Sequence, residues 1–389
     1  MYAEKLVFAQ VMEWVPHYEF HRCVARYGGD YKVRSCSCWD QFLCMAFAQV
    51  TYRESLRDIE ACLRARPNLL YHLGIRGQVA RSTLADANEQ RDWRIYADLA
   101  QKLIHRARRL YAQEPFGLEL AQTVYAFDST TIELCLTLFP WARFRQRKGG
   151  IKLHTLLDLH GAIPSFIRLT NAACHDVNGL DALPLEPGAF YLMDRGYVDF
   201  SRLYRFTEAG AFFVTRAKDG LRSWRHSSRP VPSNQGVRSD QLIRLSGRRT
   251  AESYPALLRR VTYYDPDDFR LFVYLSNQFE VAARVIALLY KSRWQVELFF
   301  KWVKGHLRLR HFYGTSENAV QTQIWIAVCV YVVIAIVRKE LGVTHSLATT
   351  LQILSVSAFE KVPLHQLLAQ NDLADSHLNM PNQLVFNGL

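Results

Sequence analysis

The sequence contains few of the residues that mark several classes of protein. Of its 389 residues only 8 are cysteine, 19 are glycine and 13 are proline. So few cysteines in so long a chain exclude a disulfide scaffold, and the composition excludes collagen-like and low-complexity chains. Hydrophobic residues make up 49% and charged residues 22%, which excludes wholesale disorder. We therefore expect a large buried core and two or three domains.

Motifs for several chemistries are missing too. Cys36, Cys38 and Cys44 cluster, but no second cysteine or histidine pair follows at zinc-finger spacing, so we expect reduced thiols in a helical core. No phosphate-binding loop of the ATP-binding type occurs. Ser129 has no histidine and acid at the spacing of a hydrolase motif, which argues against a serine nucleophile.

Long hydrophobic runs are also lacking. The N-terminus has no apolar run of the secretory type. An apolar run at 324–337 has 14 residues, fewer than the roughly 20 that cross a bilayer. We expect this run to form a buried core helix, and we predict a soluble cytoplasmic protein without a membrane partner.

Acidic residues are outnumbered by basic ones. The 48 lysines and arginines against 36 acids leave a formal charge of +12. Such a surplus indicates an anionic partner, and nucleic acid is the first candidate, although a basic protein with another role stays open. The surplus is concentrated locally. Residues 143–152 hold five basic residues and no acid, and residues 291–310 hold six with one acid, Glu297.

The pattern of residues divides the chain. Residues 1 to about 110 are helical in texture, with helix starts at Ser55 and Ser82 and an apolar period of three and four over 93–111. The broken helix pair fits a helix-turn-helix or a plain helical bundle equally well. Beyond residue 120 the pattern favours strands and one crossover helix, at 123–128, 151–159, 163–170, 189–194, 199–209 (the helix) and 211–215.

A strand, a helix and a strand in succession predict a parallel pair, so this region is an α/β core. Residues 219–279 are polar and partly β, which predicts an insertion. Residues 281–307 predict one long helix, and 319–338 an apolar helix.

Three acids stand out as candidate catalytic residues. Asp128 and Asp194 each end an apolar strand, which is where open α/β sheets place ligands. Glu297 lies on the helix predicted at 281–307, whose other faces are apolar. A helix apolar nearly all round is normally buried, so its polar stripe is expected to face a cleft. The alternative is a solvated face with ion pairs four residues apart. The stripe contains Tyr290, Arg293, Glu297, Lys301 and Lys304.

Three carboxylates suit divalent-metal chemistry on phosphates. Hard cations such as Mg²⁺ and Mn²⁺ prefer oxygen ligands. Two ions about 3.5–4 Å apart can activate water or a 3′-hydroxyl and stabilise the leaving oxygen of a phosphodiester. The neighbouring basic residues would then hold the phosphates.

Residues 290–304 resemble the signature of a known family. Tyr290, Arg293, Glu297 and Lys304 have the spacing found in DDE transposases of bacterial insertion sequences, in the insertion-sequence-four group. The surroundings of Asp128 and Asp194 are similar to that family as well. The separation of 103 positions between Asp194 and Glu297 matches the group's β-rich insertion before the catalytic helix.

The resemblance implies a ribonuclease-H-like mixed sheet flanked by helices, with a β-rich insertion and an N-terminal all-α domain. It implies Asp128, Asp194 and Glu297 as ligands of two Mg²⁺ ions, which Mn²⁺ can replace. The predicted activity is hydrolysis at the terminal inverted repeats and strand transfer into target DNA by a homodimer, at the bacterial nucleoid. The predicted segments are an N-terminal DNA-binding domain (1–112), a core in two parts (113–218 and 280–345), a β-rich insertion between these parts (219–279) and a helical tail (346–389).

Nine residues are predicted to contact DNA: Tyr290, Arg293, Lys301, Lys304, Arg143, Arg145, Arg147, Lys148 and Trp224. In the resembling family an aromatic residue of the insertion stabilises a flipped base while a DNA hairpin forms, and Trp224 and Tyr263 are both candidates here. The alternatives are a nuclease of the same fold without strand transfer and a non-catalytic DNA-binding protein. A glycoside hydrolase is disfavoured, because neutral sugars need no cation cluster.

Overall fold

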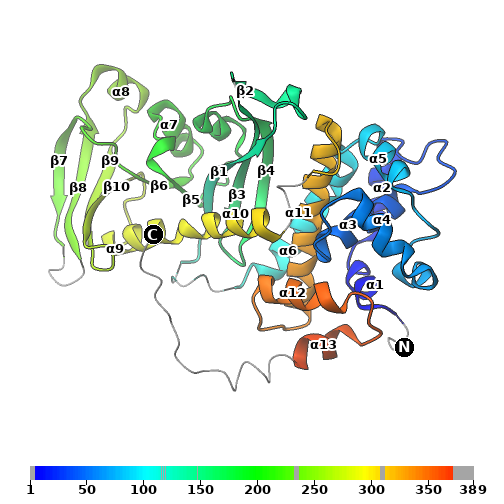
Figure 1. Ribbon diagram of the computed structural model, residues 1–389. Coiled ribbons are helices and arrows are strands. Elements are labelled where there is room, and N and C mark those ends of the chain that lie inside the picture. Colours follow the sequence, from blue (N-terminus) through cyan, green and yellow to red (C-terminus); the bar gives the residue numbers. More distant parts are fainter. Residues whose placement is uncertain are drawn as a thin grey trace. The chain divides into compact units, whose positions relative to one another are not determined.

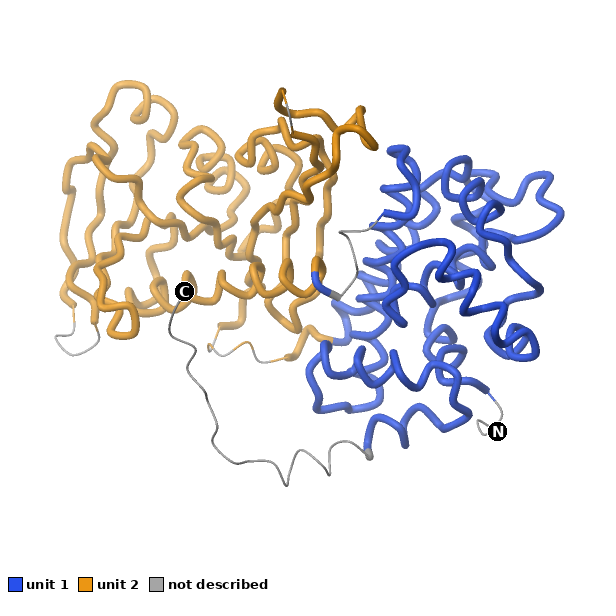
Figure 2. The backbone as a smooth tube through the Cα atoms, in the orientation of Figure 1, with its two compact units in different colours: residues 1–110, 305–389 blue, residues 111–304 orange. Residues whose placement is uncertain are grey.

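The computed structural model describes residues 5–114, 116, 118, 120–146, 148–231, 236–306 and 312–370. The chain packs into two compact units (Figure 2). Unit 1 combines residues 1–110 with 305–389, and unit 2 is the continuous segment 111–304. The five segments predicted from the sequence remain a proposal for the functional division of the chain.

Unit 1 is helical in its described part, as the sequence predicts. Its helices are α1 (Val7–Met12), α2 (His17–Arg26), α3 (Cys38–Val50), α4 (Leu56–Arg64), α5 (Arg81–Gln90), α6 (Arg94–Tyr111), α11 (Glu317–Glu340), α12 (Leu347–Ser357) and α13 (Leu364–Gln370). Ser55 caps α4 by accepting a hydrogen bond from the backbone N–H of Asp58. Sixteen residues with two short 3₁₀ turns separate α4 from α5. A helix-turn-helix needs a turn of about three or four residues, so the structure favours the bundle.

Helix α11 is the core of unit 1. It is the one helix in the described ranges that is long and apolar enough to cross a membrane, yet 94% of its most apolar stretch is buried inside the protein. It packs against α3, α5 and α12 (Figure 1). A helix that is apolar on every side must be surrounded by other elements, as predicted for the run at 324–337.

Unit 2 is built on a large mixed sheet. Its strands are β1 (Val124–Leu134), β2 (Arg143–Arg145), β3 (Lys148–Asp158), β4 (Ile163–Asn171), β5 (Phe190–Met193), β6 (Phe212–Arg216), β7 (Ser223–Arg229), β8 (Val237–Leu245), β9 (Leu258–Asp265) and β10 (Arg270–Ser276). The described strands follow the order β2-β3-β1-β5-β6-β10-β9-β8-β7, and β4 also pairs with β3.

The strand pairing is ribonuclease-H-like, as predicted. Strands β1, β3 and β4 form antiparallel pairs, whereas β5 lies parallel to both β1 and β6. Helix α7 (Phe200–Glu208) provides the crossover between β5 and β6 and is capped by Asp199. The insertion does not form a separate layer. Its strand β10 pairs antiparallel with β6, so β7 to β10 extend the core sheet (Figure 1).

Two predicted elements differ from the structure. Strand β1 does not end at Asp128 but continues to Leu134, because its β-branched second half pairs with β3. The single helix predicted over 281–307 is two helices, α9 (Ala283–Ser292) and α10 (Trp294–His306), which meet at Arg293.

The exposure of α10 also differs from the prediction. Trp294 and Leu298 are 56% and 48% exposed, so the helix is not buried all round. Its core contacts come from a narrower stripe, Val296, Phe299, Phe300 and Val303.

Candidate active site

The parallel pairing of β1 and β5 places two acids side by side. The last residue pair of this ladder is Phe127 and Met193, and Asp128 and Asp194 are the next residues on each chain segment. Because the two segments are parallel, both carboxylates lie at the same end of the paired strands. The register accounts for a proximity that a sequence separation of 66 residues does not show.

Asp128 lies in a partly buried, hydrogen-bonded position. Its Oδ1 accepts hydrogen bonds from the backbone N–H of Ser129 at 2.8 Å and from the Tyr197 hydroxyl at 3.2 Å. Its Oδ2 accepts one from Arg293 Nη1 at 3.3 Å. Burial raises the pKa of Asp128 and outweighs the hydrogen bonds and the Arg293 charge, which act in the opposite direction.

Asp194 is held by a tyrosine and an arginine. The Tyr290 hydroxyl donates to its Oδ1 at 3.0 Å, and Arg216 Nη2 donates to the same oxygen at 3.1 Å. Burial raises the pKa of Asp194, but the backbone N–H of Arg195, the Tyr290 hydroxyl and the Arg216 charge together hold it below its usual value. Asp194 is therefore the more readily ionised of the two aspartates.

Arg293, at the junction of α9 and α10, links Glu297 to the sheet. Its Nη2 donates to Glu297 Oε1 at 2.6 Å, while its Nη1 donates to Asp128. The Arg293 side chain is only 14% exposed. Burial lowers the pKa of Arg293, but the hydrogen bond to Glu297 and the neighbouring charges leave it raised overall. Tyr290 and Arg293 thus face the two aspartates, whereas Lys301 of the same predicted stripe is exposed, and the Arg293–Glu297 pair that the alternative predicted is also present.

The donor set fits a hard divalent cation by its chemistry. Asp128, Asp194 and Glu297 supply only carboxylate oxygens, the ligands that Mg²⁺ and Mn²⁺ prefer. In the described part of the chain, no three acidic, histidine or cysteine side chains lie close enough together to hold an ion as they stand. Instead Arg293 lies between Asp128 and Glu297, and Arg216 contacts Asp194.

The other residues predicted to contact DNA lie away from the acids. Arg143 and Arg145 are exposed on the edge strand β2, and Lys148 is exposed at the start of β3. Leu134 lies six positions beyond Asp128 on β1 and pairs with Gly149, so this basic group lies roughly 20 Å from Asp128. Arg147 lies outside the described residues.

Trp224 and the two lysines of α10 occupy three further positions. Trp224 is 72% exposed on β7, the opposite edge of the sheet. Five strand-to-strand steps separate β7 from β5, about 24 Å in the pairing direction. Lys301 is exposed, and Lys304 is half-buried. Of the residues predicted to contact DNA, the structure thus brings Tyr290 and Arg293 to the acids. The other predicted basic residues that it describes are spread along the sheet and α10.

The structure adds two residues that sequence reasoning missed. Arg216 contacts Asp194 from the end of β6, and Tyr197 contacts Asp128 from the turn after β5. Asp194 was chosen as a candidate because it ends a strand, and the same reasoning applies to Arg216. Strand β6 is parallel to β5, so its last residue lies beside the end of β5. Arg216 was missed because only acids at strand ends were considered.

Two side chains of β3 near Asp128 are buried. His154 is fully buried, so it is a core residue and not a DNA contact. Lys152 is also buried and pairs with Asp176 at 2.8 Å. Asp176 in turn accepts a hydrogen bond from Ser129 at 2.5 Å. Asp176 therefore supports the segment next to Asp128.

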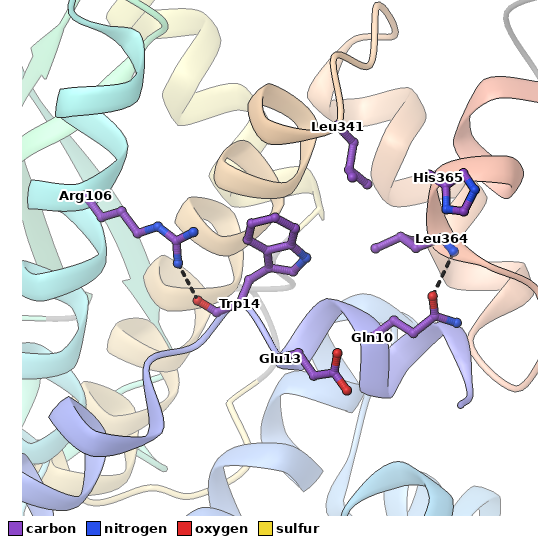
Figure 3. A pocket seen from close by; sticks show the side chains of 7 residues that line it. All are labelled: Gln10, Glu13, Trp14, Arg106, Leu341, Leu364 and His365. Atoms are coloured by element: carbon purple, nitrogen blue, oxygen red, sulfur yellow. Dashed lines mark hydrogen bonds between the residues drawn. The ribbon is translucent and has the colours of Figure 1, made fainter. Parts of the chain in front are cut away.

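Unit 1 contains a cavity of about 590 Å³ lined by Gln10, Glu13, Trp14, Arg106, Leu341, Leu364 and His365 (Figure 3). Gln10 accepts a hydrogen bond from the backbone N–H of Leu364 at 2.8 Å, and Arg106 donates to the backbone oxygen of Trp14 at 3.2 Å. These polar groups tie helices of unit 1 together, and none of the three acids lines this cavity.

Two known protein families match parts of this chain. A family described as a transposase DDE domain matches residues 119–333, and a domain of unknown function (DUF4372) matches residues 3–76. A protein of Sinorhizobium fredii (strain NBRC 101917 / NGR234) designated transposase y4zB is 34% identical over 264 residues, 66% of this chain and 71% of that protein.

Two further relatives carry similar designations. The transposase designated for insertion sequence element IS5377 of Geobacillus stearothermophilus is 28% identical over 65% of this chain and 66% of its own length. The one designated for IS4SA of Synechocystis sp. (strain ATCC 27184 / PCC 6803 / Kazusa) is 26% identical over 71% of this chain and 78% of its own length.

Among solved structures, the piggyBac transposase synaptic complex with hairpin DNA aligns with a TM-score of 0.45 and 9% identity, covering 98% of this chain and 85% of that one. The assignment depends on the family match and the relatives instead. The DDE family match spans more than half of the sequence and includes all three acids. This chain therefore belongs to the DDE transposase family.

Proposed function

We propose that this protein binds the terminal inverted repeats of its mobile element, hydrolyses phosphodiesters at the element ends and transfers those ends into target DNA. One observation carries the proposal. Three carboxylates from β1, the end of β5 and α10 are linked through Arg293 and Tyr290 in a ribonuclease-H-like core. We infer that the active form is a homodimer in the cytoplasm, at the bacterial nucleoid.

The carboxylates are the proposed metal ligands. Asp128, Asp194 and Glu297 would hold two Mg²⁺ ions, or Mn²⁺ in their place. When bound, such ions supply charge stabilisation at the scissile phosphate and a more acidic water or 3′-hydroxyl. Tyr290 and Tyr197 orient the two aspartates through their hydroxyl groups.

The cations are the proposed DNA contacts. Arg293 precedes Glu297 just before the start of α10, and Lys304 follows Glu297 on that helix. The two side chains can therefore bind phosphates on either side of the scissile bond. Lys301 is exposed beside them. Arg143, Arg145 and Lys148, roughly 20 Å from Asp128, are positioned to follow the duplex backbone.

The helical N-terminal segment is the proposed reader of element ends. A test of this role must keep residues 317–340, because they form helix α11, the core of unit 1. A fragment of residues 1–110 would lack that core. The test is therefore footprinting of the full chain, as its Glu297→Gln variant, on element-end DNA and on random DNA. Equal protection of both would contradict end recognition.

Trp224 is the better candidate for stacking on a flipped base. Its side chain is 72% exposed on the edge strand β7, whereas Tyr263 is half-buried on β9 between two neighbouring strands. Stacking on an exposed ring offsets part of the few kcal/mol that flipping costs. Trp224→Ala should lower the yield of hairpin ends, and Tyr263→Leu, which also removes an aromatic ring, should not.

A plasmid assay tests the proposed function as a whole. Supercoiled DNA carrying the element ends should be cut with Mg²⁺ and not with EDTA, and joined products should appear in target DNA. Cutting without joining would favour the nuclease alternative. Binding without cutting would favour the non-catalytic DNA-binding protein. A glycoside hydrolase is disfavoured by two arginines that contact the acids, Arg216 and Arg293.

A further inference from the structure

We propose that two neighbouring loops of unit 1, residues 30–37 and 74–79, form a contact surface for the duplex DNA of the element end. We call them the paired loops. The inference rests on the proposed role of the N-terminal segment and names the part of that segment that touches DNA. Arg34 and Arg76 are the cations that bind backbone phosphates there, and Tyr31 is the aromatic residue beside them.

The paired loops enclose a groove of about 380 Å³. Arg34 comes from one loop and Arg76 from the other, and both line the groove with exposed side chains. Neither arginine forms an ion pair with an acid in the described ranges. An exposed cation without an acid partner is free to neutralise a phosphate, and that contact releases counter-ions from the DNA. The exposed amide of Gln78 lines the same groove and adds a neutral donor and acceptor.

The two acids that line the groove are engaged by backbone N–H groups. Asp30 accepts a hydrogen bond from the N–H of Cys38 at 2.7 Å. Asp40 is only 4% exposed and accepts hydrogen bonds from the N–H of Ser37 at 2.8 Å and from that of Arg76 at 3.2 Å. Asp40 thereby joins the end of one loop to the other. The two arginines are therefore held at one groove before DNA binds, which lowers the entropy lost on binding.

The backbone of the first loop is strained and held in place. Lys32 and Cys36 have φ angles of 58° and 54°, in the left-handed region that residues other than glycine seldom adopt. Such residues persist where the surroundings fix them, and they cluster at ligand sites. Arg91 fixes this loop by donating hydrogen bonds to the backbone oxygens of Cys36 and, at 3.0 Å, Ser37.

The tip of the first loop presents an aromatic ring beside a cation. Tyr31 is 76% exposed, and the Lys32 ammonium lies 5.2 Å from its ring centroid. Exposed aromatic rings among cations suit nucleic acid, because rings stack on bases while cations and hydroxyl groups bind phosphates. The paired loops hold three cations and one acid. This charge is complementary to a DNA backbone.

The salt dependence of DNA binding by the full chain tests this surface. The probe is a fluorescein-labelled duplex that carries one element end. Arg34→Gln and Arg76→Gln together should reduce the slope of log K against log salt concentration by about 1.8, which is about 0.9 for each lost phosphate contact. The affinity should fall roughly 10- to 100-fold at about 0.1 M salt. Tyr31→Leu should lower the affinity about fivefold or more and leave the slope unchanged.

The matched control is Arg22→Gln, outside the paired loops. Arg22 is another exposed cation of unit 1, and it lies 5.8 Å from the ring centroid of the exposed Tyr18. It already pairs with Glu19 at 3.5 Å. Its removal should therefore change the slope by less than about 0.3. At saturating protein the Arg34→Gln, Arg76→Gln double variant should cut bound DNA at the original rate, and its thermal unfolding should match that of the original protein.

Each failure has a distinct meaning. An unchanged slope in the double variant, with normal DNA binding by the original protein, would overturn the paired-loop inference and leave the proposed function intact. An equal loss in Arg22→Gln would also overturn it, because any positive charge on unit 1 would then suffice. No binding of element-end DNA by the original protein would overturn the proposed end recognition and this inference with it.

Discussion

The hydroxyl group of Tyr290 donates a hydrogen bond of 3.0 Å to Oδ1 of Asp194, although the two residues are 96 positions apart in the chain. The ring of Tyr290 is held by Tyr274, with 4.9 Å between ring centroids. Burial raises the pKa of Tyr290 to about 12, so the hydroxyl stays protonated and keeps donating near neutral pH. A helix residue thus fixes the orientation of a strand-end carboxylate.

Tyr290→Phe should slow cleavage without abolishing it. It removes one hydrogen bond to a charged group, worth roughly 1.5–3 kcal/mol, or about 10- to 100-fold in rate if it acts fully in the transition state. Because this bond helps to keep the pKa of Asp194 low, the acid limb of the pH–rate profile should move to higher pH. Tyr274→Phe keeps the ring contact and should leave the profile in place.

Replacing any of the three acids should separate binding from cleavage. Glu297→Gln, Asp128→Asn and Asp194→Asn keep the size of each side chain but remove its charge, so DNA binding should persist. Cleavage of element-end DNA with Mg²⁺ should fall by about 10³-fold or more, because an amide is a poor ligand for a hard cation. A wild-type cleavage rate in folded Glu297→Gln protein would refute the three-carboxylate site.

Arg293→Ala and Lys304→Ala should weaken the active complex, and extra Mg²⁺ should not restore it, because the lost contacts are to phosphate.

By contrast, Arg143→Gln should change the affinity for DNA and not the rate of cleavage in the bound complex. Its removal should reduce the slope of log K against log salt concentration by about 0.9, the value of one phosphate contact on duplex DNA. A slope that stays constant in Arg143→Gln would remove this arginine from the interface.

His154→Gln should make the protein more tolerant of acid. Burial lowers the pKa of His154 from 6.5 to about 4, so between these values the unfolded chain binds a proton that the folded protein does not. Folding stability is therefore lost as the pH falls through this window. Urea unfolding at about pH 7 and about pH 5 should show a loss for the original protein that is larger by roughly 1–2 kcal/mol than for the variant. Exposed His72→Gln serves as the control.

Asp240→Ala should destabilise the insertion strongly. Arg259 and Asp240 form two hydrogen bonds of 2.8 and 2.9 Å with side chains only 2% and 5% exposed. Removing Asp240 leaves a buried charge uncompensated, at a cost of roughly 3–5 kcal/mol. Since Arg259 also donates to the backbone oxygen of Val281, just before α9, cleavage should become heat-sensitive as well. Thermal unfolding measures the first effect and cleavage after heating the second.

The control for that prediction is an exposed pair in the same insertion. Arg248 and Glu252 lie 3.4 Å apart with side chains 93% and 68% exposed. Water screens such a pair, so Glu252→Ala should change stability by less than about 0.5 kcal/mol. Equal losses in Asp240→Ala and Glu252→Ala would show that burial does not govern the Asp240 pair.

Much of this architecture can be predicted from local sequence patterns. The change from helical to strand-like periodicity near residue 120, the cap at Ser55 and the apolar run at 324–337 each report on a single element and its immediate environment. The spacing of Tyr290, Arg293 and Glu297 is likewise a local pattern, because about 3.6 residues make one helical turn, although the structure divides this stretch into α9 and α10 at Arg293. Such patterns identified the fold class and the acids proposed as the site.

Tertiary structure decided what depends on partners distant in the chain. The sequence did not show that β1 continues beyond Asp128, since that half of the strand is stabilised by pairing with β3. Nor did it show that α11 completes a unit begun by residues 1–110. Arg216 is the clearest case. Its place at the end of a predicted strand can be read from the sequence, but its contact with Asp194 cannot, because that contact depends on β6 lying parallel to β5 so that both strands end on the same side of the sheet.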